Sequence, residues 1–348
     1  MPNKGQRYLE GTGSRRCSSV PYPSTLRQRL LVGKADMKLD TQKWAGCRLG
    51  LESGYIHDRD CRLVSWQSLV VDIGCPRSIQ GIYTKPSITM GRLEGKVAIV
   101  TGGSSGFGAA ISRAFAAEGA HVFVCDINAE GGRAVAASNP SNLTFQQLDV
   151  TKSAQWDAAI EAAVAAHGRV DILINNAGTS YAHKPTLQVT EDEFDRVFAV
   201  NVKSVYLGTN AFARAVVATS SSQSSPVPVG GFSVINISST GSQRPRPELV
   251  WYNASKGAVS NATKGLAAEF GPAGIRVNAV LPLITATPLF ETFVGPDSEA
   301  ARKKLADGIP LGRIGQVDDV VGACLWLASS EAAFVTGVNL PVDGGRCI

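Results

Sequence analysis

Tyr252 and Lys256 are the residues whose types and spacing suggest chemistry most directly. On a helix, residues four apart share one face and lie one turn from each other. An ammonium near a phenol stabilises the phenolate, so we expect Lys256 to lower the pKa of Tyr252 from about 10 toward neutral pH. Such a phenol could exchange a proton with a bound alcohol or ketone. The alternative is a solvated helix face, where the same two residue types are common.

Two serines precede this pair. Ser238 and Ser239 lie fourteen and thirteen residues before Tyr252. The stretch therefore combines hydroxyl, phenol and ammonium groups, and whether they form one site depends on the elements that position them.

From residue 96 onward, short apolar runs alternate with Ala-rich amphipathic stretches. Continuously apolar runs are typical of strands that are covered on both faces. This alternation predicts an α/β protein with a Rossmann-type, three-layer, doubly wound parallel sheet of about seven strands. The predicted strands are 96–100, 121–126, 144–150, 170–178, 232–238, 275–282 and 337–345, the predicted helices include 107–118, 153–167, 191–218, 252–270 and 317–329, and 219–231 is expected to be an exposed loop.

Gly102, Gly106 and Gly108 follow the first predicted strand, where the chain turns into a helix. Glycine lets the backbone approach a pyrophosphate, whose charge is stabilised at the amino end of that helix. A glycine-rich turn without a ligand is the alternative. Because a strand, the loop, a helix and a second strand follow in this order, the sequence favours a dinucleotide site.

Asp126 ends the second predicted strand, about 20 residues beyond the glycines. A carboxylate there can accept hydrogen bonds from the adenosine ribose hydroxyls, and it would repel a 2′-phosphate. No Arg or Lys lies in residues 102–108 or directly after Asp126 to neutralise such a phosphate. The sequence therefore favours NAD over NADP, while Asp126 could also cap the helix that follows.

Together these motifs resemble those of the short-chain dehydrogenase/reductase family, in the family's order. The resemblance is carried by "TGGSSGFG" at 101–108, "NNAG" at 175–178, Asn201 in "NVKSVYLG", Ser239, and the pair Tyr252 and Lys256. It covers residues 90–348. It implies an oxidoreductase that interconverts a secondary alcohol and a ketone with a nicotinamide cofactor.

By motif match, the resemblance implies four catalytic residues, Asn201, Ser239, Tyr252 and Lys256. Tyr252 would exchange the substrate's proton, and Ser239 would orient the substrate oxygen. Lys256 would also bond the nicotinamide ribose, and Asn201 would support a proton relay through water. The family's spacing selects Ser239 over Ser238 for the serine role.

The resemblance also implies cofactor contacts in the loops that follow the strands. The residues expected there are Gly102, Ser104, Ser105, Gly106, Phe107, Gly108, Asp126, Asp149, Val150, Asn176, Ala177, Gly178, Tyr252, Lys256, Pro282, Thr285 and Thr287. Asp149 and Val150 would lie against the adenine, and Asn176 and Gly178 would shape the floor beneath the cofactor. Asp149 could also cap a helix, and Gly178 could serve a tight turn.

One position departs from the family pattern, because Leu283 stands where a glycine usually follows the proline. This leucine could narrow the pocket or point into packing. Residues 284–307 are expected to form a variable flap, with Leu289, Phe290 and Phe293 either covering the pocket or anchoring the flap itself.

The substrate is less well defined by the sequence. Arg244 and Arg246 border the predicted site, but no arginine cluster indicates a phosphate or carboxylate group. A lipophilic or alicyclic secondary alcohol or ketone is favoured, with sugars and acyl thioesters as alternatives. An NADP-dependent ketone reductase and a non-catalytic dinucleotide-binding scaffold are the alternative functions.

Residues 1–89 differ in composition from residues 90–348, which we expect to form the short-chain dehydrogenase/reductase domain. The first segment carries 14 Lys+Arg against 7 Asp+Glu, and the second carries 20 against 22. We expect residues 1–89 to be a poorly structured extension: a disordered arm, upstream sequence carried by the gene model or, less favoured, a mitochondrial targeting segment. Because its basic residues are scattered, the sequence does not indicate nucleic-acid binding.

The remaining features predict a cytoplasmic protein without a metal or a membrane partner. The seven cysteines form no CxxC pair, so neither a zinc site nor a disulfide framework is indicated. No apolar run approaches the roughly 18 to 20 residues of a membrane span. Family members similar to this chain commonly pair two long helices, which makes a homotetramer the first expectation and a homodimer the second, through 191–218 and 252–270.

Overall fold

The computed structural model describes residues 50–52, 55–58, 61–64, 91–221, 230–287, 290–294 and 298–348. The chain divides into two units, residues 1–83 and 84–348. In the first unit, β1 (Gly50–Glu52), β2 (Tyr55–Asp58) and β3 (Cys61–Val64) form an antiparallel sheet. The rest of the predicted extension lies outside the described residues.

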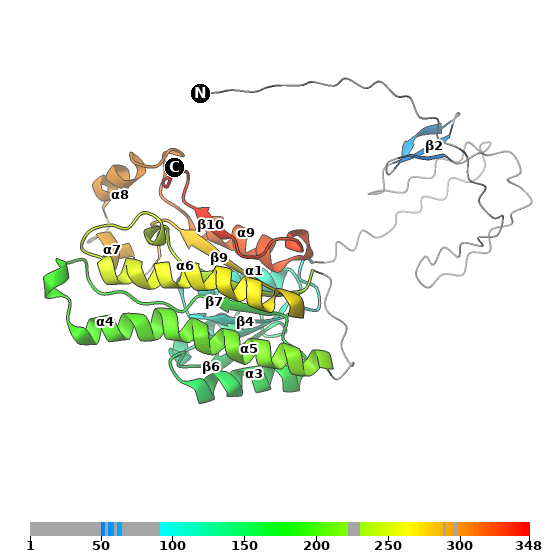
Figure 1. The fold of residues 1–348 in the computed structure, drawn as a ribbon, viewed down its shortest axis with the longest axis horizontal. Helices are drawn as coiled ribbons and strands as arrows, with labels where there is room; N and C mark the ends of the chain where they lie inside the picture. Colours follow the sequence, from blue (N-terminus) through cyan, green and yellow to red (C-terminus); the bar gives the residue numbers. More distant parts are fainter. Residues whose placement is uncertain are drawn as a thin grey trace, which may run out of the picture. The chain divides into compact units, whose positions relative to one another are not determined.

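The second unit is built on a parallel sheet of seven strands, which confirms the predicted doubly wound fold (Figure 1). The strands lie in the order β10-β9-β8-β7-β4-β5-β6. Their bounds are β4 (Val97–Thr101), β5 (His121–Asp126), β6 (Leu143–Gln147), β7 (Ile172–Asn175), β8 (Phe232–Ile237), β9 (Ile275–Pro282) and β10 (Asn339–Val342). The strand order reverses between β4 and β7, where the loops at the carboxyl ends of the strands diverge and leave a crevice for a ligand.

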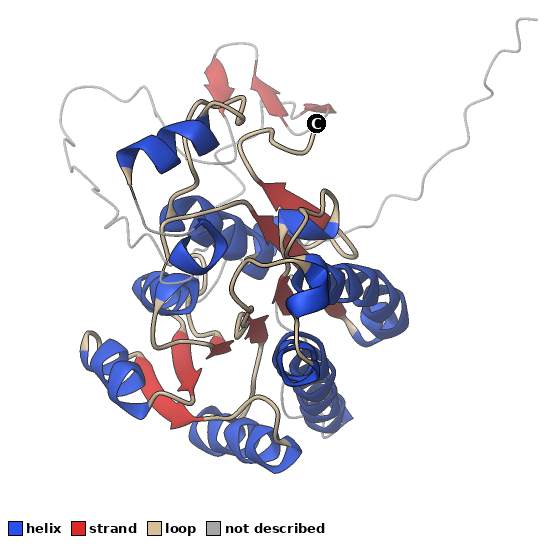
Figure 2. Cartoon of the chain, turned by 90° about the vertical axis from the view of Figure 1, so that its left-hand side faces the viewer, coloured by secondary structure: helices blue, strands red, loops and turns tan. Residues whose placement is uncertain are grey.

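Helices cover both faces of the sheet, as Figure 2 shows. One face carries α1 (Gly106–Ala117), α2 (Ala129–Ala137) and α9 (Val317–Ala328), and the other carries α3 (Ser153–His167), α5 (Ser204–Ser221) and α6 (Val250–Phe270). Alternate residues of β4 supply the two cores, Ala98 and Val100 to the first and Val97 and Ile99 to the second. Burial on both faces explains why this strand is a continuous apolar run.

The helix predicted over 191–218 is divided by a change in helical type. α4 (Glu191–Phe198) begins with a capping box between Thr190 and Glu193, and a π-helical turn, Ala199–Lys203, joins it to α5. Such turns are frequent at functional sites. This one contains Asn201.

Several elements were not among the predicted helices. These are α2, α7 (Phe290–Val294), α8 (Glu299–Ala306), and the 3₁₀ turns Thr186–Gln188, Thr240–Ser242, Gly271–Ala273 and Ser330–Ala332. Of the loop predicted over 219–231, residues 219–221 instead belong to the end of α5, and residues 222–229 lie outside the described residues.

A chain of buried polar side chains ties the centre of the sheet to α6. Asn175 in β7 donates a 2.9 Å hydrogen bond from Nδ2 to Oδ1 of Asn236 in β8. Asn236 in turn donates from Nδ2 to Oγ1 of Thr263 at 2.9 Å, and Thr263 donates to the carbonyl oxygen of Val259. Buried polar groups normally need such partners, so this chain fixes two strands against one helix.

Candidate active site

A cavity of about 650 Å³ lies at the carboxyl ends of the parallel strands. Its walls include residues that follow β4, β6, β7, β8 and β9, and the C-terminal residues after β10. The cavity therefore occupies the crevice at the reversal of the strand order, where open α/β sheets bind their ligands.

The glycine-rich loop after β4 forms one wall. Gly102 and Gly106 have φ angles of 63° and 51°, which glycine adopts without strain. A Cβ on Gly108 would lie 2.1 Å from the carbonyl oxygen of Gly102, so only glycine allows this close approach of α1. Ser105 at the start of α1 makes no side-chain cap, and the first turn holds no acidic residue. The helix end and loop thus fit the pyrophosphate of a dinucleotide.

Asp126 lies beside this loop at the end of β5. Its Oδ2 accepts a 2.9 Å hydrogen bond from the backbone N–H of Ser104, and its Oδ1 accepts one of 2.8 Å from that of Asn128. The carboxylate is thereby fixed, with further lone pairs available to a ligand in the cavity. The helix that follows is capped by Asn128, whose side chain accepts from Gly131, and not by Asp126.

The loop after β7 forms the floor. Asn176 donates from Nδ2 to the carbonyl oxygens of Thr101 at 2.8 Å and Gly102 at 3.2 Å, which joins this loop to the glycine loop. Asn176, Ala177 and Gly178 all line the cavity. A side chain on Gly178 would come within 3.4 Å of the ammonium of Lys256.

The loop after β6 reaches the same cavity through Asp149 and Val150. Oδ1 of Asp149 accepts hydrogen bonds from the backbone N–H of Thr151 at 2.9 Å and from its hydroxyl at 2.7 Å. Asp149 therefore also has a structural role at the entry to α3.

Tyr252 lies in the first turn of α6 and lines the cavity together with Ser239. The hydroxyl of Ser239 lies near enough to the phenol of Tyr252 to lower its pKa. Ser239 Oγ also accepts the backbone N–H of Gly241 at 3.1 Å. Ser238 instead donates to the carbonyl oxygen of Lys256 at 2.9 Å and is 3% exposed. Of the two serines, the structure pairs Ser239 with the tyrosine.

Lys256 lies one turn after Tyr252 and is 4% exposed. Its Nζ donates a 2.8 Å hydrogen bond to the carbonyl oxygen of Ile237 at the end of β8. The same nitrogen lies 5.9 Å from the centroid of the Tyr252 ring. The serine, tyrosine and lysine thus border one cavity beside the floor of the dinucleotide site.

The predicted effect of Lys256 on the phenol is wrong. Burial raises the pKa of Tyr252 to about 12, and the hydrogen bond with Ser239 and the charge of Arg246 offset this only in part. Burial also lowers the pKa of Lys256 from 10.5 to about 8. Both groups lose hydration, which penalises whichever form is charged. The phenol is therefore protonated at neutral pH and can act as an acid.

Two predicted site residues, Gly108 and Asn201, do not line the cavity. Asn201 is 1% exposed. Its Oδ1 accepts from the backbone N–H of Thr179 at 2.8 Å, and its Nδ2 donates to the carbonyl oxygen of Thr179 at 2.9 Å and to Oγ of Ser255 at 3.0 Å. The π-helical turn thus lets Asn201 join the floor loop to α6.

The loop after β9 brings Pro282, Leu283, Thr285 and Thr287 to the cavity. Glu248 is the one non-glycine residue with positive φ in the part of the chain that the structure describes. The backbone at Leu283 therefore does not require the glycine that the family usually has there, and the leucine borders the cavity.

The two described phenylalanines of the flap have different roles. Phe293 in α7 lines the cavity, and its ring centroid lies 5.1 Å from that of Tyr252. Phe290 is 3% exposed and packs beneath Arg302, whose guanidinium carbon lies 5.2 Å from the ring centroid. Leu289 lies outside the described residues.

Besides Lys256, four cationic residues line the cavity, whereas the sequence indicated no such cluster. They are Arg244, Arg246, Lys304 and Arg346. The two arginines after β8 are about a hundred residues from Arg346, so no local sequence pattern joins them. Arg244 nevertheless donates a 2.7 Å hydrogen bond from Nη1 to the carbonyl oxygen of Arg346.

Tyr181 is a further residue that the sequence did not single out. Its hydroxyl, buried with the ring, accepts a 3.0 Å hydrogen bond from the backbone N–H of Trp251 at the start of α6. Because Leu249, the N-cap, cannot provide this bond, Tyr181 helps to fix the turn that carries Tyr252.

The described cysteines, Cys125, Cys324 and Cys347, are free thiols. Within the described ranges, no group of three or more His, Cys, Asp or Glu side chains could hold a metal ion. Nor does the described part of the chain include a helix of the length and apolarity needed to cross a membrane.

The matching family model and two curated relatives are named as reductases and dehydrogenases. A family model described as Enoyl-(Acyl carrier protein) reductase matches residues 102–346. The 4-formylbenzenesulfonate dehydrogenase of Comamonas testosteroni is 46% identical over 269 residues, 74% of this chain and 99% of the relative. Cyclopentanol dehydrogenase of the same species is 38% identical over 259 residues, 74% of this chain and 98% of the relative.

A solved structure is similar over the same part of the chain. The 3-ketoacyl-(acyl-carrier-protein) reductase from Brucella melitensis, crystallised with NADH, aligns with a TM-score of 0.68 and 42% identity, covering 74% of this chain and all of that one. The chain belongs to the short-chain dehydrogenase/reductase family, as its motifs predicted. It is an NAD(P)-dependent alcohol dehydrogenase or ketone reductase of that type.

Proposed function

We propose that the protein is an NAD-dependent oxidoreductase that interconverts a secondary alcohol and its ketone on a lipophilic or alicyclic small molecule. The observation that carries this proposal is that Ser239 and Tyr252 line the same cavity as the glycine loop. A proton donor and a dinucleotide site thus share one enclosed space.

The preference for NAD rests on Asp126. Its carboxylate is held by two backbone N–H groups at the end of β5, beside the glycine loop. A ribose with two free hydroxyls can donate to this carboxylate, whereas a 2′-phosphate would be repelled by it. Ile127, which also lines the cavity, brings no positive charge to offset that repulsion.

Each proposed catalytic residue has a distinct task. A bound nicotinamide supplies the hydride for reduction, or accepts it in oxidation. Ser239 donates a hydrogen bond to the substrate oxygen, and Tyr252 gives that oxygen its proton during reduction and takes it back during oxidation. Lys256 uses the N–H groups not engaged by Ile237 to bind the nicotinamide ribose. Asn201 holds the floor loop and α6 in register and supports the proton relay.

The apolar side of the cavity supports a lipophilic or cyclic substrate. Phe293, whose ring centroid lies 5.1 Å from that of Tyr252, borders it together with Leu283, Leu305 and Ile309. Desolvation of an apolar ring against such walls contributes roughly 25 cal/mol per Å² of buried apolar surface. The names of the two relatives, which refer to a substituted benzene ring and to cyclopentanol, agree with a ring-bearing substrate.

We also propose a cytoplasmic homotetramer, with a homodimer as the alternative. Tyr206 and Val217 on α5 are 63% and 52% exposed, and they lie eleven residues apart, close to three helical turns. An apolar pair on one helix face supports a contact between copies through α5 and α6. Light scattering at several protein concentrations would measure the assembly.

Steady-state absorbance of the reduced nicotinamide tests the proposed activity. We expect oxidation of cyclic secondary alcohols with NAD, and at least a tenfold lower kcat/KM with NADP. Equal rates with both cofactors would overturn the assignment to NAD. Binding of NADH without turnover of any alcohol or ketone would instead favour the scaffold function.

A further inference from the structure

The two ends of the cavity carry opposite charge. Asp126 and Asp149 are the acidic residues among those that line it, and they follow β5 and β6 at one side of the sheet. Arg244 and Arg246 follow β8, and Arg346 follows β10, at the other side. The strand order itself therefore separates a carboxylate end from a cationic end.

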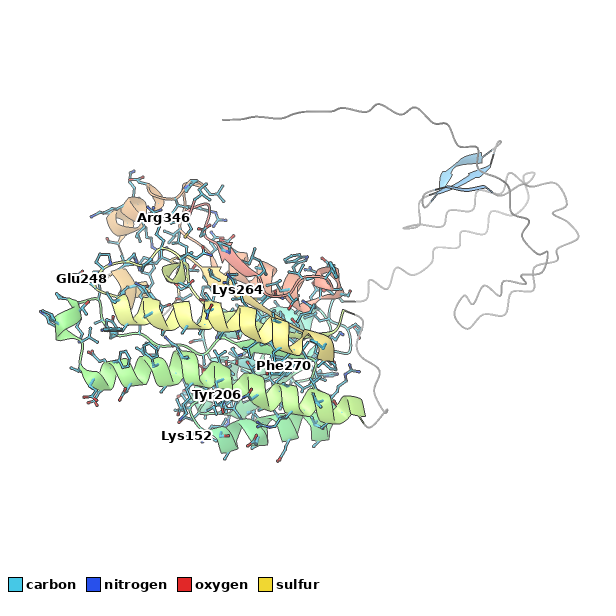
Figure 3. The ribbon with its side chains drawn as sticks, in the orientation of Figure 1. Lys152, Tyr206, Glu248, Lys264, Phe270 and Arg346 are labelled. Atoms are coloured by element: carbon cyan, nitrogen blue, oxygen red, sulfur yellow. The ribbon has the colours of Figure 1, made fainter. Side chains whose placement is uncertain are left out.

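The cationic end is built from three separate segments. Arg246 comes from the loop between β8 and α6, Lys304 from α8, and Arg346 from the chain after β10. Arg346 lies near α8 in Figure 3, and a Cβ on Gly308 would be 3.6 Å from its guanidinium carbon. The three segments thus converge on the side of the cavity that holds Tyr252.

The charge of Arg246 acts on Tyr252, the proposed proton donor. Its charge lowers the pKa of Tyr252, and burial and the charge of Arg346 lower its own pKa. Its position is fixed through its backbone, because Asn253 in α6 donates from Nδ2 to the carbonyl oxygen of Arg246 at 3.0 Å. Among the residues that the structure describes, the side chains of Arg246, Lys304 and Arg346 form no ion pair.

Neighbouring cations without counter-charges raise the free energy of the folded protein, and an anion bound between them would lower it. Guanidinium groups bind carboxylate and sulfonate oxygens with paired N–H donors. We propose that the substrate carries such an anionic group, which Arg246 and Arg346 bind while Lys304 adds a third positive charge. This inference rests on the proposed function, because it assigns a substrate class to the same site.

The resulting substrate has three parts that match three regions of the cavity. Its hydroxyl or carbonyl lies at Ser239 and Tyr252, its ring lies against Phe293 and Leu283, and its anion lies at the two arginines. Arg244 has a structural task, because Nη1 holds the backbone of Arg346 in place. It orients the chain that carries the binding residue.

Binding of a matched pair of ligands tests the proposal without requiring turnover. Cyclohexanecarboxylate and cyclohexanecarboxamide have similar shapes and differ in charge. In calorimetric titrations of the protein with NAD, we expect the carboxylate to bind at least about tenfold more tightly, or about 1.4 kcal/mol. The preference should weaken as salt rises from about 20 mM to about 200 mM, because screening acts on exposed charges.

The double variant Arg246→Gln/Arg346→Gln should lose this preference and keep its affinity for the carboxamide. Arg113→Gln is the matched control, since Arg113 is an exposed arginine of α1 that does not line the cavity. Equal affinity for both ligands in the unaltered protein, or an unchanged preference in the double variant, would overturn the proposal. A melting temperature within a few degrees of the unaltered protein shows that the variants are folded.

Turnover separates this inference from the proposed function. We expect 3-hydroxycyclohexanecarboxylate to be oxidised with a higher kcat/KM than its amide. Oxidation of both at the same rate would overturn the charge assignment and leave the proposed activity in place. Tighter binding of the acid without oxidation of any alcohol would support the charge assignment and overturn the proposed activity.

If the double variant instead lost only the reduction of a ketoacyl group on an acyl carrier protein, the arginines would serve an acidic protein and not a small anion.

Discussion

The two ends of the cavity differ in charge and in how the chain builds them. The dinucleotide end comes from adjacent elements, since β4, the glycine loop, α1 and β5 are consecutive and end at Asp126. The opposite end collects Arg246, Lys304 and Arg346 from segments that are far apart in the sequence. A contiguous motif can therefore preserve the cofactor site while scattered substitutions change the substrate.

The largest effect is expected at Tyr252, the proposed proton donor. Tyr252→Phe removes the hydroxyl that would transfer the proton, and it leaves the ring against Phe293 in place. Loss of a general acid typically lowers a rate by about 10² to 10⁴-fold, and we expect about 10³-fold in kcat. NADH binding, followed by fluorescence, should change little. Turnover at the unaltered rate would remove Tyr252 from the mechanism.

The pH dependence of the two reaction directions tests the protonation state of Tyr252. Burial raises the pKa of Tyr252 to about 12, so below that pH the protonated form is favoured. Ketone reduction uses this protonated form, whereas alcohol oxidation needs the phenolate, whose fraction rises tenfold per pH unit. We expect kcat/KM for oxidation to rise by about 100-fold between about pH 7 and about pH 9.

Reduction should behave differently in the same buffers. It should show no such rise, because the protonated phenol that it uses is the major form throughout this range. An oxidation profile that is level across this range would show that the phenol titrates at a much lower pH than the structure indicates.

A single methyl group should disturb the dinucleotide end. In Gly108→Ala the added Cβ would lie 2.1 Å from the carbonyl oxygen of Gly102, so the loop must move by about 1 Å. Displacements of that size can lower a catalytic rate about 100-fold, and we expect a loss of that order in kcat/KM together with weaker NADH binding. Gly265→Ala is the control, because its Cβ meets nothing within 4 Å inside α6. Equal losses in both variants would contradict the role of the loop.

The smallest effect is expected at Asp126, which we propose binds the adenosine ribose of the cofactor. Asp126→Asn removes the charge that opposes a 2′-phosphate, and its single amide oxygen can accept only one of the two backbone N–H groups of Ser104 and Asn128. Hydrogen bonds to charged groups contribute about 1.5–3 kcal/mol, so the ratio of kcat/KM with NAD to that with NADP should fall by about tenfold or more. An unchanged ratio would mean that another group selects the cofactor.

The segments that form the strands and most of the long helices could be predicted from the sequence, because each depends on local apolar patterning. The glycine loop could be predicted too, since its function needs three glycines within seven residues. The π-helical turn at Asn201 could not, because nothing in "NVKSVYLG" distinguishes it from an ordinary helix. It is held by Thr179 and Ser255, one well before it and one well after it in the chain.

The sequence was least informative about electrostatics. The spacing of Tyr252 and Lys256 is correct for one helix face, yet the sign of the pKa shift at the phenol depends on burial, which spacing does not reveal. The cationic cluster was missed for a related reason. Arg346 approaches Arg244 only because β10 is added at the edge of the sheet beside β9.

The hydrogen-bonded chain from Asn175 through Asn236 to Thr263 has a consequence for alignment of the strands. Apolar strands that are buried on both faces can slide past each other by two residues and still meet apolar neighbours. Such a shift of β7 against β8 would separate Nδ2 of Asn175 from Oδ1 of Asn236, and an unpaired buried group costs about 1–3 kcal/mol. Directional amides therefore determine which residues stand at the strand ends, and through them how far the hydroxyl of Ser239 lies from the floor of the nucleotide site.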